Sequence, residues 1–251
     1  MRIATFNILN GRSPDDDVVD PDRLCRAVAA LDADVLALQE VDRSQARSGN
    51  ADLTALAAGA MGAVDHRFVA ALSGPPSLWT GATGDEPDGT PAYGISLLSR
   101  YPVLAWHVVR LPPVAVKVPY RPSGRVRIEW VRDEPRVALL ADVQAPSGPL
   151  RVATTHLSFL PVSSGRQLRM LTRSLGRSPG PVVLVGDLNM SPRRARRITG
   201  MSALAGGPTF PAGQPAVQLD HILSDRPLAT VAGGPRALEV SDHRALFVDI
   251  H

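Results

Sequence analysis

Short apolar runs that end in polar residues recur along this sequence, and they restrict its possible folds more than any other feature. Ile3 to Phe6 run into Asn7, for example, and residues 182–186 run into Asp187. Apolar runs of this length are typical of buried strands. Polar residues in or beside such runs include Asn7, Glu40, His156, Asp187, Asp220 and Asp242. Because loops at strand ends usually carry function, we expect these side chains to meet at one edge of a sheet.

The N-terminal segment predicts a strand, a helix and a second strand. Residues 2–9 and 35–40 have the apolar pattern of strands. Between them Asp20 or Asp22 can cap a helix, and Pro21 suits its first turn. The apolar residues that recur there at helical spacing are Leu24, Ala27, Val28 and Leu31.

The rest of the chain predicts two groups of strands, each accompanied by helices. The expected strands are 67–72, 93–99, 103–111, 126–131, 136–143, 150–157, 182–187, 217–223 and 245–250, and the expected helices are 52–62, 164–175 and 192–200. Residues 74–91, rich in glycine and proline, predict a surface loop. This order favours two sheets packed face to face with helices outside. Because no linker divides the chain, we expect a single domain over 1–251.

Composition narrows the class of protein. With 44% hydrophobic and 20% charged residues, the chain has enough apolar side chains for a sizeable core. The single cysteine, Cys25, excludes an intrachain disulfide and a cysteine-based zinc cluster, and its apolar helical surroundings predict a buried structural thiol. The N-terminus enters a strand pattern at once, without a long apolar segment. We therefore expect a cytoplasmic monomer that does not insert into membranes.

The set of polar residues points to chemistry that no member indicates alone. A lone aspartate at a strand end is more often a turn former, and a lone histidine is more often structural. Together the carboxylates, asparagines and histidines supply oxygen ligands for a hard cation and acid/base groups. Phosphoester hydrolysis needs both, because the attacking water must lose a proton and the phosphate charge must be neutralised. The set therefore predicts a phosphoester hydrolase that uses Mg²⁺ or Mn²⁺.

Seven short motifs resemble, in order, those of the endonuclease/exonuclease/phosphatase superfamily, in its deoxyribonuclease-like branch. They are TFNIL (5–9), LQEVD (38–42), YGISLLSR (93–100), THL (155–157), GDLN (186–189), LDHIL (219–223) and SDHR (241–244). Single motifs are short, but seven in the family's order are specific. The resemblance implies an α/β fold, a four-layered α/β/β/α sandwich of two packed mixed sheets.

The resemblance also implies a role for each motif residue. The implied metal ligands are Glu40, Asn7 and Asp242. The implied catalytic residues are His156, Asp187, Asn189, Asp220 and His243. In this scheme Asp187 and Asn189 position or activate the water, and Asp220 orients His243, which accepts a proton or donates a hydrogen bond to the phosphate. His156 resembles a second phosphate-binding or leaving-group histidine. Arg136 matches an arginine near the phosphate, although a charge that merely flanks a strand explains it almost as well.

Two departures from the family's patterns narrow the branch. Apurinic endonucleases carry an acidic residue where this chain has Leu9 and a tyrosine where it has His156. The resemblance therefore favours relatives of deoxyribonucleases, sphingomyelinases and tyrosyl-DNA phosphodiesterases. Many relatives have Gly-Asn where this chain has Gly94 and Ile95, so we assign that segment a structural role.

The sequence allows more than one class of substrate. The arginines that directly follow the 186–189 motif are Arg193, Arg194, Arg196 and Arg197. They could hold flanking phosphates of nucleic acid, or they could form a solvated helix face. The leading hypothesis is a nuclease, and a small soluble or lipid phosphoester is the alternative substrate. A catalytically silent binding protein is the alternative of another class, because fold does not prove activity.

Overall fold

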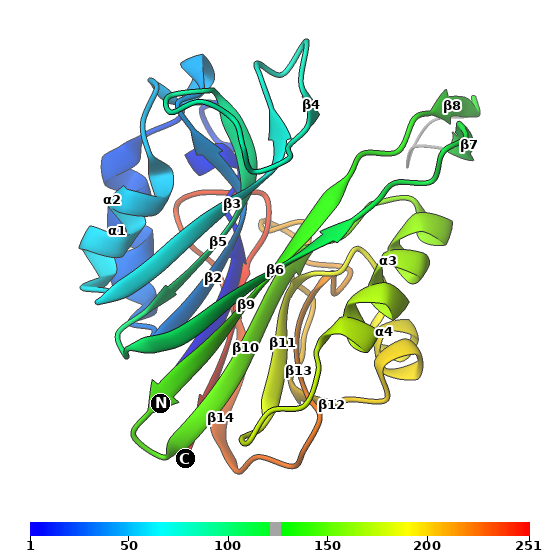
Figure 1. The fold of residues 1–251 in the computed structure, drawn as a ribbon. Helices are drawn as coiled ribbons and strands as arrows, with labels where there is room; N and C mark the ends of the chain where they lie inside the picture. The colour runs from blue at the N-terminus through cyan, green and yellow to red at the C-terminus, as the bar shows by residue number, and fades with distance from the viewer. Residues whose placement is uncertain (121–126) are drawn as a thin grey trace.

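The computed structural model describes residues 1–120 and 127–251 as two stacked sheets with a helix pair on each outer face (Figure 1). Within these residues, the first sheet has seven strands in the spatial order β14 (Thr230–Arg236), β15 (Ala245–Ile250), β1 (Arg2–Asn7), β2 (Val35–Arg43), β5 (Ala92–Ser99), β3 (Asp65–Ser73) and β4 (Thr80–Gly81). The second, also counted over the described residues, has six in the order β12 (Ser202–Ala205), β13 (Asp220–Ser224), β11 (Val182–Asp187), β10 (Gly148–His156), β9 (Arg136–Ala145) and β6 (Val103–Leu111).

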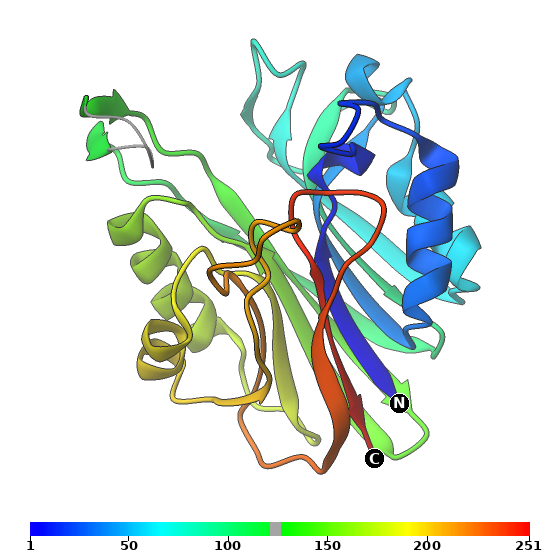
Figure 2. The ribbon, with the colours of Figure 1, turned by 180° about the vertical axis from the view of Figure 1, so that it is seen from behind.

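Both sheets are mixed, which confirms the predicted α/β/β/α sandwich. Strand β1 runs parallel to β2 and antiparallel to β15, while β10 runs parallel to β11 and antiparallel to β9. A small hairpin of β7 (Val118–Tyr120) and β8 (Glu129–Val131) extends beyond the second sheet (Figure 1). The loop between β3 and β5, which contains β4, extends from the same end of the molecule (Figure 2).

Three apolar clusters hold the layers together. The cluster between the sheets includes Ile95 and Val152, and side chains of this kind lose nearly all their contact with water. A second cluster joins the first sheet to helices α1 (Pro21–Leu31) and α2 (Leu53–Met61), and a third joins the second sheet to α3 (Pro161–Ser174). Each apolar side chain buried in this way contributes roughly 1.5–3 kcal/mol. The inter-sheet cluster therefore fixes the relative position of the two strand edges that carry the polar residues.

Local signals start α1, α2 and α4 close to where the sequence predicts them, whereas α3 begins at Pro161, earlier than the predicted start at 164. Asp20 caps α1 by accepting hydrogen bonds from the backbone of Asp22 and Arg23, and Pro21 is the first helical residue. Asp52 caps α2 in the same way. Helix α4 (Pro192–Thr199) also begins at a proline. None of the helices in the described ranges is long and apolar enough to cross a membrane.

Several sequence predictions need correction. The expected strand at 217–223 begins only at Asp220, because Val217 forms a separate bridge with Phe210. Of the expected strand at 126–131, only Glu129–Val131 is a strand, and position 126 lies outside the described residues. The edge strands β12 and β14 were not predicted, since β14 is largely exposed and contains two glycines and a proline. The Cys25 thiol is only partly buried, so that prediction was wrong.

A β-bulge at Glu40 breaks the alternation of β2. Gln39 pairs with Ile95 and Val41 pairs with Gly94, so Glu40 is an extra residue, and its φ of 56° is left-handed. Leu38 points to the helix-covered face, and strict alternation would send Glu40 there too. The bulge lets Val41 take that place instead and leaves Glu40 out of the pairing.

Candidate active site

Residues of both sheets meet at the edge where β1 and β11 end. Asn7, the last residue of β1, places its amide Nδ2 3.1 Å from Oε1 of Glu40 and 3.1 Å from Oδ2 of Asp187. Glu40 comes from the first sheet and Asp187 from the last position of β11 in the second. The structure thus brings together three residues that the sequence analysis placed at strand ends.

The Glu40 carboxylate has the character of a cation ligand. It is partly exposed, and it accepts a hydrogen bond from the neutral amide of Asn7. Across the described parts of the chain, no basic side chain forms an ion pair with it. Carboxylate and amide oxygens are the donors that Mg²⁺ prefers. Glu40 could therefore hold a divalent cation, and Asn7 would present its oxygen to the same ion after rotation of its amide.

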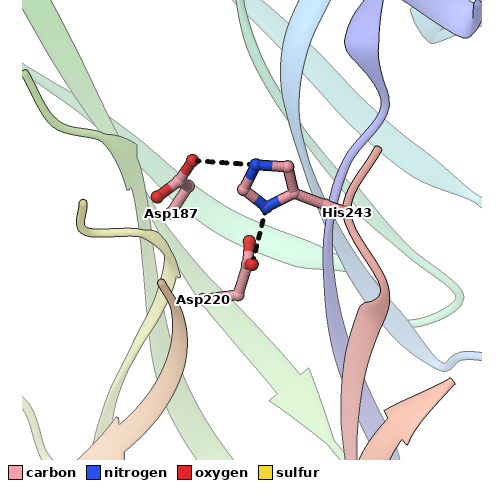
Figure 3. A group of neighbouring side chains, drawn as sticks. All are labelled: Asp187, Asp220 and His243. Carbon is pink, nitrogen blue, oxygen red and sulfur yellow. Dashed lines mark hydrogen bonds and ion pairs between the residues drawn. The ribbon is translucent and has the colours of Figure 1, made fainter. Parts of the chain in front are cut away.

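Asp187, Asp220 and His243 form a buried group in which one potential ligand atom from each residue lies within 4.8 Å of the other two (Figure 3). His243 Nδ1 lies 2.8 Å from Asp220 Oδ2, and its Nε2 lies 3.9 Å from Asp187 Oδ2. The Asp220 contact orients the imidazole ring and directs Nε2 towards Asp187. This geometry suits a histidine that exchanges a proton or a hydrogen bond with a phosphate.

Two hydroxyl groups that the sequence analysis did not single out hold this group in place. Ser241 Oγ donates a 2.6 Å hydrogen bond to the Asn7 carbonyl and accepts one of 3.0 Å from the His243 amide. Thr209 Oγ1 accepts from the amide of Asp220 at 3.3 Å. Ser241 stands two residues before His243, a spacing at which serine side chains often bond the backbone, so a signal existed. Thr209 offers no such signal.

His156 and Asn189 complete the edge of the second sheet. His156 Nε2 lies 3.5 Å from Asp187 Oδ2 and 3.3 Å from Asn189 Nδ2. The Asn189 backbone N–H also donates to Asp187 Oδ1 at 2.9 Å, and its φ of 50° lets the chain turn sharply after β11. The five predicted catalytic residues therefore lie in one connected network.

Burial and neighbouring charges shift the pKa values of this network in different directions. Burial, with the charge of Asp220, raises the pKa of Asp187 to about 7. Burial lowers the pKa of His243, but the hydrogen bond and charge of Asp220 outweigh it and bring the pKa to about 9. Burial and the charge of Arg136 hold the pKa of His156 well below its ordinary value. At neutral pH the site therefore contains a cationic imidazole, a neutral imidazole and a carboxyl group able to exchange a proton.

The remaining predicted site residues lie around this network. Arg136, the first residue of β9, is 7% exposed, and its Nε has no hydrogen-bond partner among the described residues. Its Nη2 pairs with the Glu134 carboxylate at 3.4 Å. Asp242 is partly exposed, and its backbone carbonyl accepts a 2.6 Å hydrogen bond from Ala212. Within the described ranges, the Asp242 carboxylate forms no hydrogen bond or ion pair with the other site residues.

The four predicted phosphate-binding arginines lie on α4, in the outer helical layer (Figure 2). Arg193, Arg196 and Arg197 are exposed, while Arg194 is partly buried and donates to the Pro161 carbonyl at the start of α3. Over the described residues, none of the four forms a hydrogen bond or ion pair with Asp187 or the other catalytic residues. The side chains of Arg193, Arg196 and Arg197 are therefore open to solvent.

The family profile described as the endonuclease/exonuclease/phosphatase family matches residues 4–243, which include every motif residue up to His243. The chain belongs to this family. The match confirms the resemblance predicted from the seven motifs. Members of the family are phosphoester hydrolases that use divalent metals, which agrees with the oxygen donors found beside Asp187. Among curated proteins, none matches this sequence.

Solved structures of family members share the fold. A protein described as an endonuclease/exonuclease/phosphatase from Beutenbergia cavernae has a TM-score of 0.73 at 25% identity, covering 100% of this chain and 71% of that one. A mannosyl-6-phosphatase from Bacteroides thetaiotaomicron has a TM-score of 0.68 at 15% identity, covering 100% and 99%. Truncated TDP2 from Caenorhabditis elegans has a TM-score of 0.60 at 16% identity, covering 99% and 96%. At such low identity the last two show similarity of fold alone.

Proposed function

We propose that this protein is a divalent-metal-dependent phosphodiester hydrolase whose preferred substrate is nucleic acid. The observation that carries the proposal is the position of the Asn7 amide, 3.1 Å from both Glu40 and Asp187. This position sets a carboxylate without an ion-pair partner among the described residues beside the buried Asp187, Asp220 and His243 group. A cation ligand and acid/base groups therefore share one strand edge, as phosphoester hydrolysis requires.

Each residue has a specific task in this proposal. Glu40 and Asn7 would hold one Mg²⁺ or Mn²⁺, which would offset the charge that builds up on the phosphate oxygens. Asp187, with its pKa of about 7, accepts the proton of the attacking water. His243, with its pKa of about 9, donates a hydrogen bond to a phosphate oxygen, and Asp220 keeps its ring oriented. Asp242 is proposed as a further ligand acting through water.

His156 and Asn189 would bind the phosphate from the other side. His156 is neutral near pH 7, because its pKa lies well below the ordinary value, and it can donate one ring N–H. Its contact with Asn189 holds the ring in place. Arg136 would supply positive charge, since its guanidinium is buried with an unused Nε–H among the described residues.

Nucleic acid is favoured by the basic character of the chain. Its formal charge is +3, and Arg193, Arg196 and Arg197 follow the Asp187 motif directly with their side chains open to solvent. Arginines near a phosphate site can hold neighbouring phosphates and make binding salt-dependent. A small phosphoester is the second candidate substrate, supported by the fold shared with the mannosyl-6-phosphatase. A catalytically silent protein is disfavoured, because every polar position of the site is present.

A substrate panel tests the proposal. Purified protein freed of metal with EDTA should be inactive, and added Mg²⁺ or Mn²⁺ should restore hydrolysis of single- or double-stranded DNA or RNA. The same preparation is assayed on mannose 6-phosphate and on a soluble lipid head-group phosphodiester. Faster turnover of these small esters than of every polynucleotide would show that a small phosphoester, and not nucleic acid, is the preferred substrate. Hydrolysis that persists in EDTA would refute the metal requirement.

A further inference from the structure

A cavity of about 440 Å³ shares one lining residue, Arg136, with the candidate active site. Its walls come from both sheets, with residues of β3 and β4 on one side and residues at the ends of β6 and β9 on the other. The lining residues of most interest are Ala71, Ala82, Thr83, Arg110, Pro112 and Arg136. This volume lies within the range of pockets that bind small organic ligands.

Strand order shows how the cavity relates to the catalytic residues. In the first sheet β5 separates β3 from β2, which carries Glu40, and in the second sheet β9 lies beside β10, which ends at His156. Thr155 Oγ1 donates a 2.9 Å hydrogen bond to the Val137 carbonyl, so Arg136 begins its strand next to His156. Arg136 therefore stands between the cavity and the phosphate-binding residues proposed above.

The polar and apolar groups of the cavity indicate what it would bind. Proline rings at 112, 113 and 135, with Leu111 and two alanines, supply apolar walls. Arg110 and Arg136 are the charged lining residues, and no carboxylate lines the cavity within the described ranges. Flat rings pack well against proline rings and guanidinium planes. Apolar walls beside two arginines therefore suit a ligand that has an apolar ring next to an anionic phosphate. They suit a cation or a small polar ligand less well.

Arg136 provides an independent sign of a missing ligand. It is 7% exposed, it lines the cavity, and its Nε–H has no acceptor among the described residues. A buried donor without a partner costs about 1–3 kcal/mol. An acceptor atom of a ligand spanning the cavity and the phosphate site would complete this donor.

We propose that this cavity is a specificity subsite that receives a flat, uncharged ring joined to the scissile phosphate, such as an aryl ester or the base of one nucleotide. The proposal rests on the proposed function for the position of the phosphate. The walls that flank Arg136 would then select phosphoesters by the ring attached to the phosphate.

Binding of two unreactive phosphonates tests the subsite without turnover. Phenylphosphonate and methylphosphonate differ in the group on phosphorus, a phenyl ring in one and a methyl group in the other. Their Kd values are measured by calorimetry with the complete protein in Mg²⁺. Burying the ring should make phenylphosphonate bind about tenfold more tightly. Thr83→Trp and Pro112→Trp fill the cavity from opposite walls, at positions that are exposed at the surface. Each should abolish the preference for the ring while leaving methylphosphonate within about twofold.

Leu78→Trp is the matched control, because Leu78 is 77% exposed in the same loop as Thr83 and does not line the cavity. It should leave both Kd values unchanged. Equal Kd values for the two phosphonates in the wild type would overturn the proposal, as would a ring preference that survives both filling substitutions. If the protein binds the ring as expected but hydrolyses no phosphoester, the proposed function fails and the subsite stands.

Discussion

The side-chain amide of Asn7 donates a hydrogen bond of 3.1 Å to Asp187, which lies 180 positions later in the chain. The bond crosses from the first sheet to the second at the edge where β1 and β11 end. The buried side chain of Gln39 also joins the two sheets. It accepts a hydrogen bond from Thr5 in its own sheet and donates one to Thr154 in the opposite sheet. These buried hydrogen bonds set the distance between the two halves of the site.

Glu40→Gln should abolish most metal-supported activity, because the substitution removes the charge of the proposed ligand and nearly preserves its size. The measurement is an activity titration with Mg²⁺ and Mn²⁺, in which the variant should need far more metal and reach a lower rate. Glu239→Gln is the control, since Glu239 is an exposed carboxylate. Identical titrations for Glu40→Gln and the wild type would show that Glu40 does not bind the metal.

His243→Ala should reduce turnover by about 10²–10⁴-fold, the usual contribution of a general acid/base group. Asp220→Asn should cause an overlapping loss, because the two residues share the 2.8 Å contact that orients the ring. The double variant should therefore be little slower than His243→Ala alone. Kinetics of all three variants, with the exposed His66→Ala as control, measure this overlap. Losses that multiply would mean that the two residues act independently.

Replacing Arg193 and Arg196 with alanine should weaken DNA binding across sequences, because both side chains are open to solvent after the Asp187 motif. For each phosphate that the variant no longer holds, the slope of log affinity against log salt should fall by roughly one unit. A small phosphoester reaches only the catalytic edge, so its hydrolysis should scarcely change. The control replaces Arg26 in α1 and Arg67 in β3, which belong to the other half of the sandwich. Wild-type affinity and slope in the α4 variant would exclude these arginines from binding.

Stability should depend on pH through Asp142 in β9. Arg151 donates hydrogen bonds of 2.6 and 2.8 Å to its carboxylate, and these bonds, opposed by burial, lower the pKa of Asp142 from its ordinary 3.8. Because the folded pKa lies below the unfolded one, the stabilisation is present above the unfolded pKa and is lost as the pH falls through the folded pKa.

Asp142→Asn should therefore lower the free energy of unfolding by about 1–2 kcal/mol at neutral pH. The gap between the variant and the wild type should close in acid, below the ordinary pKa of 3.8. Denaturant unfolding measured at several pH values checks this, with the exposed Asp88→Asn as control. A gap of constant size down to the acid limit would contradict the assignment.

Gly94→Ala should destabilise the fold by about 3 kcal/mol or more, because it overpacks the backbone. A Cβ there would lie 2.0 Å from the Val69 carbonyl oxygen, at the point where β5 faces the bulge in β2. Gly59→Ala is the control: its added Cβ meets nothing within 4 Å, so it should stabilise α2 by up to about 1 kcal/mol. Thermal unfolding of both variants measures the difference. Equal melting temperatures would show that the Val69 carbonyl does not approach Gly94 closely.

Much of the fold follows from local patterns in the sequence. The apolar runs at β1, β2 and β11 are buried as predicted, and Asp20 and Pro21 start α1 where the capping signals indicate. These features depend on neighbouring residues, whose side chains and hydrogen bonds act over a few positions. The sequence also predicted that polar residues close several strands, as Asn7, His156 and Asp187 do, while the role of each stays a prediction from the family resemblance.

Tertiary structure alone decided how those residues meet. Alternation along β2 would have placed Glu40 under the helices, and only the pairing of β2 with β5 produced the bulge that turns it to the site. The contact of His243 with Asp220 depends on packing between distant segments, and so does the buried Nε of Arg136, which has no partner among the described residues. Register, bulges and burial depend on contacts between strands that are far apart in the sequence. A short stretch of sequence therefore cannot determine them.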